Sequence, residues 1–192
     1  RVDWIKKTLP NATITYNTTN PTNQDVIATI TFDIENVIVL GGNTHRFTEN
    51  GTYLFEFVGP YGNKGTAMAE VYWIDRDEPN ATITYSTTNP TNQDVTATVT
   101  FDKENVTITN NGGKNTYTFT ENGQFEFEFV GPAGNAGTAI ANVTWIDKEA
   151  PVAEIRYSTE SATNQEVIAT ITFNEEDVTV EGGNTHTFTE NV

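Results

Sequence analysis

The sequence predicts an all-β protein built from tandem β-sandwich units, and three observations support this. First, a stretch of 23 residues, 11–33, returns as 80–102 with only three positions changed. Second, apolar and polar residues alternate with period two inside each copy, which is typical of strands with one buried face. Third, turn sequences such as Asn-Pro-Thr-Asn, Gly-Gly-Asn and Glu-Asn-Gly separate these segments at short intervals.

The tryptophans give the length of the repeat. Trp73 follows Trp4 by 69 residues and Trp145 follows Trp73 by 72, and a third copy begins near Pro151. The three additional residues fall at a Gly-Gly turn, where surface loops tolerate insertions. A unit of about 70 residues is longer than the repeats of solenoids and propellers. Each copy is therefore expected to be a domain of its own.

Alternation within the second copy predicts the strands and their inward faces. We expect six or seven strands and no helix in a unit, which indicates a β-sandwich of the immunoglobulin-like type. The strand with Phe-x-Phe-x-Phe is expected to pair with the strand containing Ala-x-Ala-x-Val-x-Trp, whose alanines leave room for the rings. The inward positions predicted in the second copy are Val95, Ala97, Val99, Phe101, Phe125, Phe127, Phe129, Ala139, Ala141, Val143 and Trp145.

The repeats divide the chain into four parts joined by short linkers that end in proline. We expect a strand remnant of a preceding repeat and its linker at 1–9, the first repeat at 10–78, the second at 79–150, and a third at 151–192 that is truncated before its last two strands. Three explanations remain open: a fragment of a longer array, a shifted domain frame, or completion by a strand from another chain. Proline fixes φ and favours an extended neighbour, so the linkers are expected to be semi-stiff.

Composition excludes several classes of function. The formal net charge is −16, from 10 Lys+Arg against 26 Asp+Glu, whereas nucleic acids and anionic membranes attract basic surfaces. The absence of cysteine excludes disulfides, cysteine zinc sites and thiol nucleophiles. No run approaches the roughly 18 apolar residues of a membrane span. Because residue 1 is arginine and no secretory leader pattern follows it, we expect a processed or excised piece of a longer protein.

One run of residues points to a family. The pattern FxFxFV-GPxGNxGTAxAxVxWID over 125–147, present in part over 55–75, resembles the tandem bacterial immunoglobulin-like repeats of Gram-positive cell-surface proteins, as does the WID-xx-x-P junction. The resemblance implies a module that separates a cell anchor from a distal head, or an accessory module of a large secreted glycosidase. Many relatives have an acidic residue near a calcium site where this chain has Gly59-Pro60 and Gly131-Pro132.

No pattern in the sequence predicts an enzyme. His45 and His186 occupy equivalent positions, but the second copy has Tyr117 there. The recurrent acid pairs Asp33/Glu35 and Asp102/Glu104 directly follow a strand, where solvated turn acids are expected. No nucleophile elbow, P-loop, HExxH or dinucleotide fingerprint is present. We therefore predict no catalytic residues and no bound organic cofactor.

The linker acids are the candidate metal ligands. Asp75, Asp77 and Glu78 cluster at one junction, and Asp147 and Glu149 at the other. Calcium prefers six to eight oxygen ligands, so such a junction is a hypothetical calcium site that would stiffen the linker. The alternative is a solvated charged linker, which the neighbouring Arg76 and Lys148 favour.

Two further hypotheses concern sugars and cross-links. Tyr61 and Tyr72 are predicted to be exposed and available for sugar stacking, although the second copy has alanine and threonine there. An isopeptide bond would need a recurrent inward lysine, and Lys103 aligns with isoleucine and glutamate in the other copies. An ester between threonine and glutamine stays open because Gln24, Gln93 and Gln165 recur, but the turn sequence explains that recurrence more simply.

The sequence thus predicts a non-catalytic spacer or stalk segment of an exported bacterial surface protein, located at the cell surface or cell wall. The alternatives are a carbohydrate-binding or host-protein-binding adhesive module, or an accessory module of a secreted glycosidase. The expected partners are neighbouring repeats of the same chain, with neither nucleic acid nor membrane insertion. Self-association through the incomplete third repeat is a further partner that the pattern offers.

Overall fold

The computed structural model describes residues 8–190 and has an all-β fold, as the sequence predicts. Every sheet is antiparallel, and within the described part of the chain the one helical element is a 3₁₀ turn, η1 (Asn111–Gly113). The predicted strand remnant at 1–9 lies largely outside the described residues. None of the described residues forms a helix of the length and apolarity that a membrane crossing needs.

The chain forms two compact units. The first unit contains residues up to 88 and 94–144, and the second contains 89–93 and 145–192. The first and second repeats therefore fold within the first unit, apart from the tip of one loop and the last residues of the second repeat. The third repeat belongs to the second unit.

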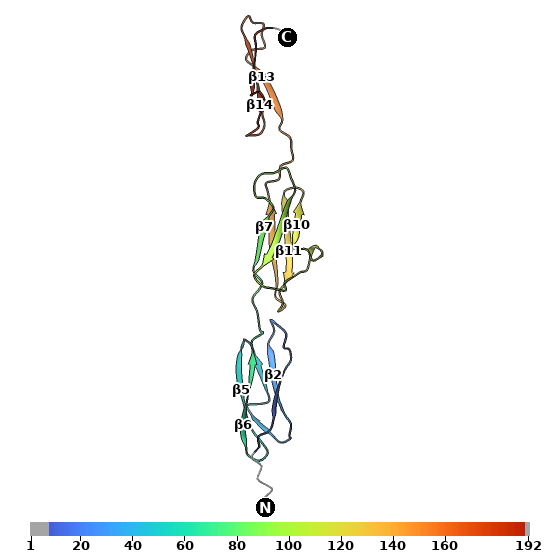
Figure 1. The fold of residues 1–192 in the computed structure, drawn as a ribbon, viewed down its shortest axis with the longest axis vertical. Helices are drawn as coiled ribbons and strands as arrows, with labels where there is room; N and C mark the ends of the chain where they lie inside the picture. Colours follow the sequence, from blue (N-terminus) through green and yellow to red (C-terminus); the bar gives the residue numbers. More distant parts are fainter. Residues whose placement is uncertain (1–7, 191–192) are drawn as a thin grey trace, which may run out of the picture. The chain divides into compact units, whose positions relative to one another are not determined.

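The first repeat consists of two three-stranded sheets with the orders β1-β2-β4 and β3-β5-β6. Both layers can be followed in Figure 1. The number of strands, six, agrees with the prediction. The strands are β1 (Ala12–Tyr16), β2 (Val26–Phe32), β3 (Ile38–Leu40), β4 (Thr44–Phe47), β5 (Gly51–Val58) and β6 (Lys64–Val71).

The second repeat has the same plan, with sheets ordered β7-β8-β10 and β9-β11-β12. The three inserted residues lie between β9 and β10, where η1 forms and Gly112 and Gly113 take positive φ angles of 62° and 77°. Beside the insertion β10 keeps the four residues of β4, while β9 has two residues where β3 has three. The strands are β7 (Ala81–Tyr85), β8 (Val95–Phe101), β9 (Thr107–Ile108), β10 (Thr116–Phe119), β11 (Gly123–Val130) and β12 (Ala136–Val143).

The register of the β5–β6 hairpin explains how the core accommodates its rings. Tyr53 lies opposite Ala69, and Phe57 lies opposite Gly65. A Cβ atom added at Gly65 would stand 2.5 Å from the Phe57 ring, so this position admits only glycine without a shift. Aromatic residues on one strand thus face small residues on the next, as the sequence predicts, and the rings pack toward the opposite sheet.

The core of each complete repeat lies between its two sheets. In the first repeat Val26, Ala28, Phe55 and Val71 are completely buried. Ring pairs join the two sheets, since Phe57 of β5 meets Phe32 of β2 at a centroid distance of 4.7 Å. Such edge-on pairs add to the free energy gained by burial alone.

The third repeat forms one three-stranded sheet in the described part of the chain. Its order is β13-β14-β15, which corresponds to β1-β2-β4 and β7-β8-β10. Its strands are β13 (Ala153–Tyr157), β14 (Val167–Phe173) and β15 (Thr185–Phe188). The register is also the same, because Ala153 pairs with Phe173 as Ala81 pairs with Phe101.

Candidate functional site at the junction of the first two repeats

Each complete repeat fastens the start of its first strand with an aspartate from the end of its second. The Asn11 backbone N–H and side-chain amide donate to the Asp33 carboxylate at 2.9 and 2.7 Å. Asn80 and Asp102 repeat the arrangement at 2.8 and 2.6 Å. The side-chain and backbone hydrogen bonds from Asn80 hold the pKa of Asp102 below its usual value. These acids therefore stabilise the beginning of the repeat, and they are not free turn carboxylates.

The proline that closes a linker packs on the glycine that follows the Phe-x-Phe-x-Phe strand. A Cβ atom added at Gly59 would stand 3.1 Å from the Pro10 ring, and one at Gly131 would stand 2.9 Å from Pro79. The Gly-Pro turn therefore forms a seat for the linker proline. The Gly-Pro pair therefore has a structural use in both complete repeats.

The asparagine of the same turn holds the linker backbone. The Asn135 side-chain amide donates to the carbonyl oxygens of Asp75 and Asp77, both at 2.9 Å. Asn63, its equivalent in the first repeat, donates to the Thr8 carbonyl at 3.0 Å. Asn135 is only 8% exposed, and each of its two amide hydrogens finds an acceptor. The turn thus fixes the path of the linker that precedes its own repeat.

A lysine of the second repeat completes this junction. The Lys103 ammonium lies 2.8 and 3.0 Å from the two Asp75 carboxylate oxygens and donates to the Asp77 carbonyl at 2.8 Å. The hydrogen bonds from the Lys103 ammonium to the Asp75 carboxylate, together with one from the Asp77 backbone N–H, hold the pKa of Asp75 below its usual value. The Lys103 side chain is 23% exposed, so the ion pair is partly shielded from water.

The first repeat holds the other end of the linker. The Asn50 side chain donates to the Ile74 carbonyl and accepts from its N–H, both at 2.8 Å. The Asp75 N–H donates to the Thr22 carbonyl at 2.9 Å, and Thr22 forms an isolated parallel bridge with Ile74 after the end of β6. Arg76 then donates to the Thr48 carbonyl at 3.1 Å.

An aspartate between two arginines adds charge to this end of the linker. The Asp25 carboxylate accepts hydrogen bonds from both Arg46 and Arg76. The pKa of Asp25 lies below its usual value, chiefly because of the hydrogen bond from Arg46. Both arginine side chains are at least half exposed, so each pair contributes little by itself. Together with the hydrogen bond to Thr48, the ion pair with Asp25 holds the Arg76 side chain against the first repeat.

The two repeats also touch directly within the first unit. The Asn23 N–H, in a turn of the first repeat, donates to the Ala133 carbonyl in the Gly-Pro turn of the second at 2.9 Å. A Cβ atom added at Gly134 would lie 3.6 Å from the Asn23 side chain. The candidate functional site is therefore a junction that hydrogen bonds and an ion pair hold on both sides.

The acids of this junction have partners within the protein, and calcium binding there stays a prediction. The Asp75 carboxylate already holds an ammonium group, and the Asp77 carbonyl accepts from both Lys103 and Asn135. Calcium would need several additional oxygen ligands. Within residues 8–190 no three His, Cys, Asp or Glu side chains are grouped to hold a metal. For Asp147 and Glu149, calcium binding stays a prediction.

The histidine considered for catalysis and the tyrosines considered for sugar binding have different surroundings. His45 stacks on Tyr53 at a centroid distance of 3.7 Å, as Tyr117 stacks on Phe125 in the second repeat. This position therefore contributes ring packing. Tyr61 and Tyr72 are exposed, at 63% and 64%, as predicted.

The two exposed tyrosines do not form a sugar platform together. Tyr61 lies in the turn before β6, and Tyr72 follows the end of β6. The strand between them, Lys64–Val71, is eight residues long, which corresponds to about 26 Å at the usual rise per residue. Stacking of one sugar on both rings is therefore excluded by distance.

The outer face of one sheet differs between the repeats. Leu54 and Met68 form a cross-strand pair on the outside of β5 and β6, and they are 51% and 55% exposed. Leu40 on the neighbouring β3 is 51% exposed. The second repeat has Glu126, Ile140 and Thr109 at these positions. The first repeat thus carries an apolar outer surface that the second lacks.

The junction contains residues that sequence reasoning did not identify as functional. The asparagine of the Gly-Pro-x-Gly-Asn turn recurs in both complete repeats, and that recurrence was a usable signal. Lys103 gave no signal, because the other repeats have Ile34 and Glu175 at its position. Only the folded chain places its ammonium group beside Asp75.

Comparison with protein-family models gives no match to this chain, and no curated protein shows significant similarity to it. The functional argument therefore depends on the geometry of the repeats and of their junction.

Proposed function

We propose that the chain is a non-catalytic spacer segment of an exported bacterial surface protein, built of tandem immunoglobulin-like domains, that holds a functional domain away from the cell wall. The observation that carries this proposal is the position of the two ends of a complete repeat. The chain enters the first repeat at Pro10, whose ring packs on Gly59. It leaves this repeat at Ile74, whose backbone is hydrogen-bonded to the Asn50 side chain.

These two points lie at opposite ends of the β5–β6 hairpin. Gly59 belongs to the turn that joins β5 to β6, whereas Asn50 precedes β5 and Ile74 follows β6. Eight residue pairs separate the two ends of this hairpin. Each complete repeat therefore adds about 26 Å between its two ends, at the usual rise per strand residue. A domain with adjacent ends would add much less.

The fastening of the junction supports a spacer that resists bending. Asn135 and Lys103 hold the linker to the second repeat, while Asn50 holds it to the first. The contacts include a charge-assisted pair and several backbone hydrogen bonds, which are individually modest but act together. A linker without such bonds would act as a free hinge.

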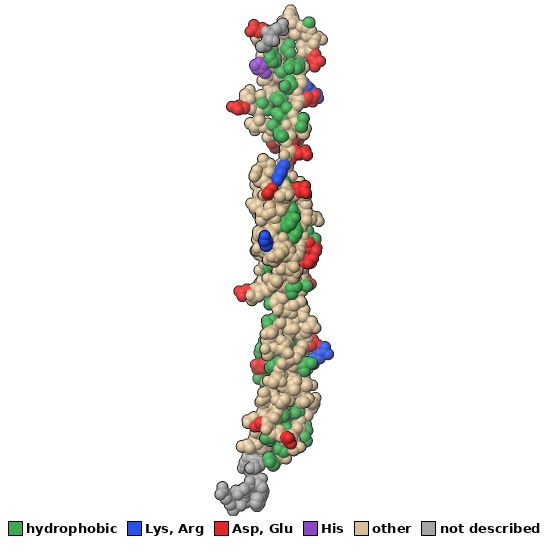
Figure 2. Space-filling model, turned by 90° about the vertical axis from the view of Figure 1, so that its right-hand side faces the viewer, with side chains coloured by type: hydrophobic (Ala, Val, Ile, Leu, Met, Phe, Trp, Pro, Cys, Tyr) green, Lys and Arg blue, Asp and Glu red, His purple; other side chains and the backbone are tan. Residues whose placement is uncertain are grey.

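The surface is consistent with a protein exposed at high local density. Acidic side chains are scattered over the face that Figure 2 shows, and basic ones are few. Threonine hydroxyls cover the outer side of the first sheet of each complete repeat, as in the Thr96–Thr118 pair at 3.2 Å. Like charge and polar sheet faces oppose edge-to-edge association.

Distance measurement between two spin labels tests the proposal. The chain has no cysteine, so Thr13→Cys and Thr82→Cys place labels at equivalent exposed positions of β1 and β7. A spacer with a fastened junction gives one narrow distance distribution. Adding Lys103→Glu and Asn135→Ala is expected to broaden it. A broad distribution that these changes leave unaltered would contradict the proposal.

An adhesive module is the second candidate, because of the apolar outer surface of the first repeat. Exposed apolar groups that lie together are characteristic of protein-binding sites. Beads coated with the chain are tested for retention on immobilised glycans and matrix proteins, beside beads coated with the Leu54→Glu variant. Retention that the substitution abolishes supports the adhesive module. No retention of either protein supports the spacer.

A further inference from the structure

The apolar outer surface of the first repeat extends over all three strands of the β3-β5-β6 sheet. Both sheets of this repeat are present, and Figure 1 shows β5 and β6 on one flank with β2 on the other. The outer side of β5 and β6 is therefore the side that the facing sheet does not cover. The surface consists of Ile38 (65% exposed), Leu40 (51%), Leu54 (51%), Met68 (55%) and the partly exposed Val58.

The strand register makes these side chains neighbours. Ile38 of β3 lies opposite Val58 of β5, and Leu54 of β5 lies opposite Met68 of β6. Leu40 is diagonal to Leu54, a separation that long side chains can bridge. All five positions lie within strands rather than in the turns or linkers. The apolar groups thus form one surface across the middle of the sheet.

A carboxylate stands within this surface. Glu56 lies on the central strand β5, between Leu54 and Val58 on the same face and opposite Leu40. Its other cross-strand neighbour is Thr66. The side chain is exposed, and among residues 8–190 it has neither a hydrogen bond nor an ion pair. Three of its four nearest neighbours on the face are therefore apolar.

The second repeat has the same carboxylate in polar surroundings. Glu128 lies at the position of Glu56, and both side chains are exposed. The second repeat forms the same two sheets without the apolar outer surface, so this surface is not needed for folding. The positions of Ile38, Leu40 and Leu54 are taken there by Thr107, Thr109 and Glu126.

The Glu56 carboxylate determines which partner fits the surface. Contiguous exposed apolar groups are characteristic of protein-binding sites, because covering them is favourable. A wholly apolar partner would also bury the Glu56 charge without a counter-charge, which is strongly unfavourable. A cation opposite Glu56 removes this penalty. Arginine fits best, since its planar guanidinium can bind both carboxylate oxygens and is more weakly hydrated than an ammonium group.

A second copy of the chain does not meet this requirement. Each copy has a formal net charge of −16, so two copies repel each other, whereas a basic partner is attracted. On the outer face of the described strands β3, β5 and β6 the basic side chain is Lys64 alone, at the first position of β6 and opposite Val58. A basic segment of another protein is therefore the better complement.

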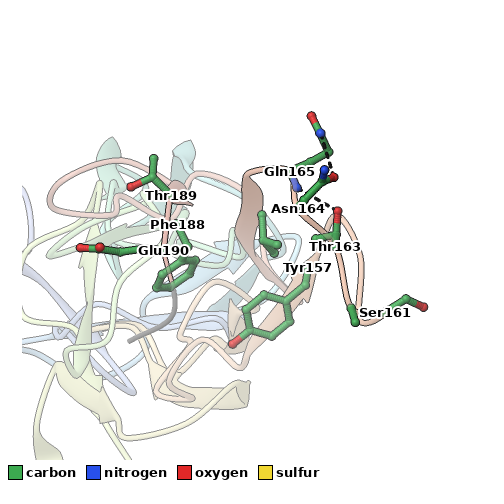
Figure 3. Close-up of a pocket in the computed structure, with 10 residues that line it drawn as sticks. Tyr157, Ser161, Thr163, Asn164, Gln165, Phe188, Thr189 and Glu190 are labelled. Carbon is green, nitrogen blue, oxygen red and sulfur yellow. Dashed lines mark hydrogen bonds between the residues drawn. The ribbon is translucent and has the colours of Figure 1, made fainter.

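The hollow drawn in Figure 3 is of a different kind. Tyr157 and Phe188 of the third repeat line it together with a loop that contains Thr163 and Gln165. In that loop the Gln165 N–H donates to the Thr163 hydroxyl at 3.0 Å. Tyr157 and Phe188 belong to the inner side of their sheet, the side that faces a second sheet in the complete repeats. This hollow is therefore not a candidate ligand site.

We propose that the apolar outer surface of the first repeat is a docking site for a basic segment of another protein, in which aliphatic side chains flank an arginine on one face. The arginine binds Glu56, and the aliphatic side chains cover Leu40, Leu54 and Met68. This inference rests on the adhesive candidate and names the chemistry of its partner. Failure of this docking would leave the spin-label distances that test the spacer unaffected.

An NMR titration with defined peptides tests the site. The probe is the peptide GTLSRSLTG, which in an extended conformation presents leucine, arginine and leucine on one face. It is added to the isotope-labelled full chain, beside a control peptide with glutamine in place of the arginine. We expect shift changes confined to β3, β5 and β6, and binding of the control at least about tenfold weaker. No change at millimolar peptide, or equal binding of the two peptides, would overturn the proposal.

Matched variants separate the site from the general negative charge of the chain. Glu56→Gln removes the charge and keeps the shape, whereas Glu128→Gln makes the same change at the equivalent position of the second repeat. Both side chains are exposed, so neither change should disturb the fold. We expect binding at least about tenfold weaker in the first variant and unchanged in the second. Equal losses in both would contradict the proposal.

A third variant tests the apolar part of the surface. Leu54→Glu introduces the amino acid that the second repeat has at this position, so it is compatible with the fold. We expect it to abolish peptide binding, and retained binding would overturn the proposal. Sedimentation of the unchanged chain provides a further check. A stable dimer that Leu54→Glu separates would mean that a second copy covers the surface, which would also overturn the proposal.

Discussion

The second and third repeats have nearly the same first sheet but bury it to very different degrees. The pairing of β7 with β8 is residue for residue that of β13 with β14. Yet Ala97 is 0% exposed in the second repeat, while the equivalent Ala169 is partly exposed in the third. The difference is the facing sheet. In the second repeat β9, β11 and β12 cover the first sheet, β7-β8-β10.

The comparison shows that strand pairing and burial have different sources. Register follows from the alternating pattern and the turns of the three strands, which the two repeats share. Burial needs a second surface, and the free energy gained from it grows with the apolar area covered. Substitutions at equivalent positions should therefore have very different consequences in the two repeats.

The largest expected difference concerns a phenylalanine at the same place in both sheets. Phe119 is 4% exposed in the second repeat, and Phe188, its equivalent, is partly exposed in the third. Phe119→Ala should destabilise the second repeat by about 3–5 kcal/mol, because it leaves a cavity between two sheets. Phe188→Ala should cost less than about 1 kcal/mol, as expected for a partly solvated side chain.

Hydrogen exchange at two equivalent amides measures both effects separately. The Val99 N–H donates to the Asn115 carbonyl and the Ile171 N–H to that of Asn184, both at 2.9 Å. Faster exchange at Val99 in Phe119→Ala, with little change at Ile171 in Phe188→Ala, is the expected result. Equal effects would show that the sheet of the third repeat is covered as completely as the first sheet of the second repeat.

A smaller effect is expected where a ring of one strand lies over the backbone of the next. A Cβ atom added at Gly137 would stand 2.7 Å from the Phe129 ring, whereas nothing lies within 4 Å of one at Gly123. Gly137→Ala should cost about 1–3 kcal/mol, because the ring must move within a packed core.

Gly123→Ala is the control in the same hairpin and should change stability little. Thermal unfolding of both variants, beside the unchanged chain, gives the comparison. If Gly137→Ala proved neutral, the Phe129 ring would have room to move, and the β11–β12 hairpin would pack less tightly on the first sheet of the second repeat than the structure indicates.

The smallest effect concerns pH at the junction. The hydrogen bond from Lys103 lowers the pKa of Asp75, so the folded state binds a proton there less readily than the unfolded chain. The ionised Asp75 therefore stabilises the folded state fully when the pH is above the pKa of the unfolded aspartate, about 3.9. This stabilisation is lost as the pH falls through the lower pKa of the folded state.

Melting temperatures at pH 7 and at pH 3 test this effect in the unchanged chain and in Lys103→Met. The substitution removes the ammonium group and should reduce the loss of stability of the first unit at acid pH. The third repeat has Glu175 at the position of Lys103, so the pair is specific to one junction. An unchanged acid dependence in the variant would show that Asp75 gains nothing from the lysine.

Much of the fold could be predicted from the sequence. Period-two alternation identified the inward residues Val95, Ala97, Val99, Phe127 and Phe129, all of which are buried. The expected pairing of the aromatic strand with the alanine strand is confirmed by β11 and β12. These predictions succeeded because they depend on local pattern and on strand pairs that are close in sequence.

The candidate site was much less predictable. The linker acids were considered as calcium ligands because of their own composition, whereas the groups that neutralise or hold them come from elsewhere. Lys103 is 28 residues from Asp75, and Asn135 is 60 residues from it. A contact at such separation leaves no periodic trace in one sequence, and Lys103 occurs in one repeat alone.

The sequence by itself determined the alternating strand segments, the inward residues of the second repeat and the pairing of its aromatic strand with its alanine strand, because each follows from residues near one another in the chain. Tertiary structure alone decided which charges meet at the junction and how completely each inward residue is buried. Val95 and Val167 occupy the same place in the pattern, but only Val95 has a second sheet above it in the described structure. Burial is a property of two surfaces, and a strand pattern describes only one of them.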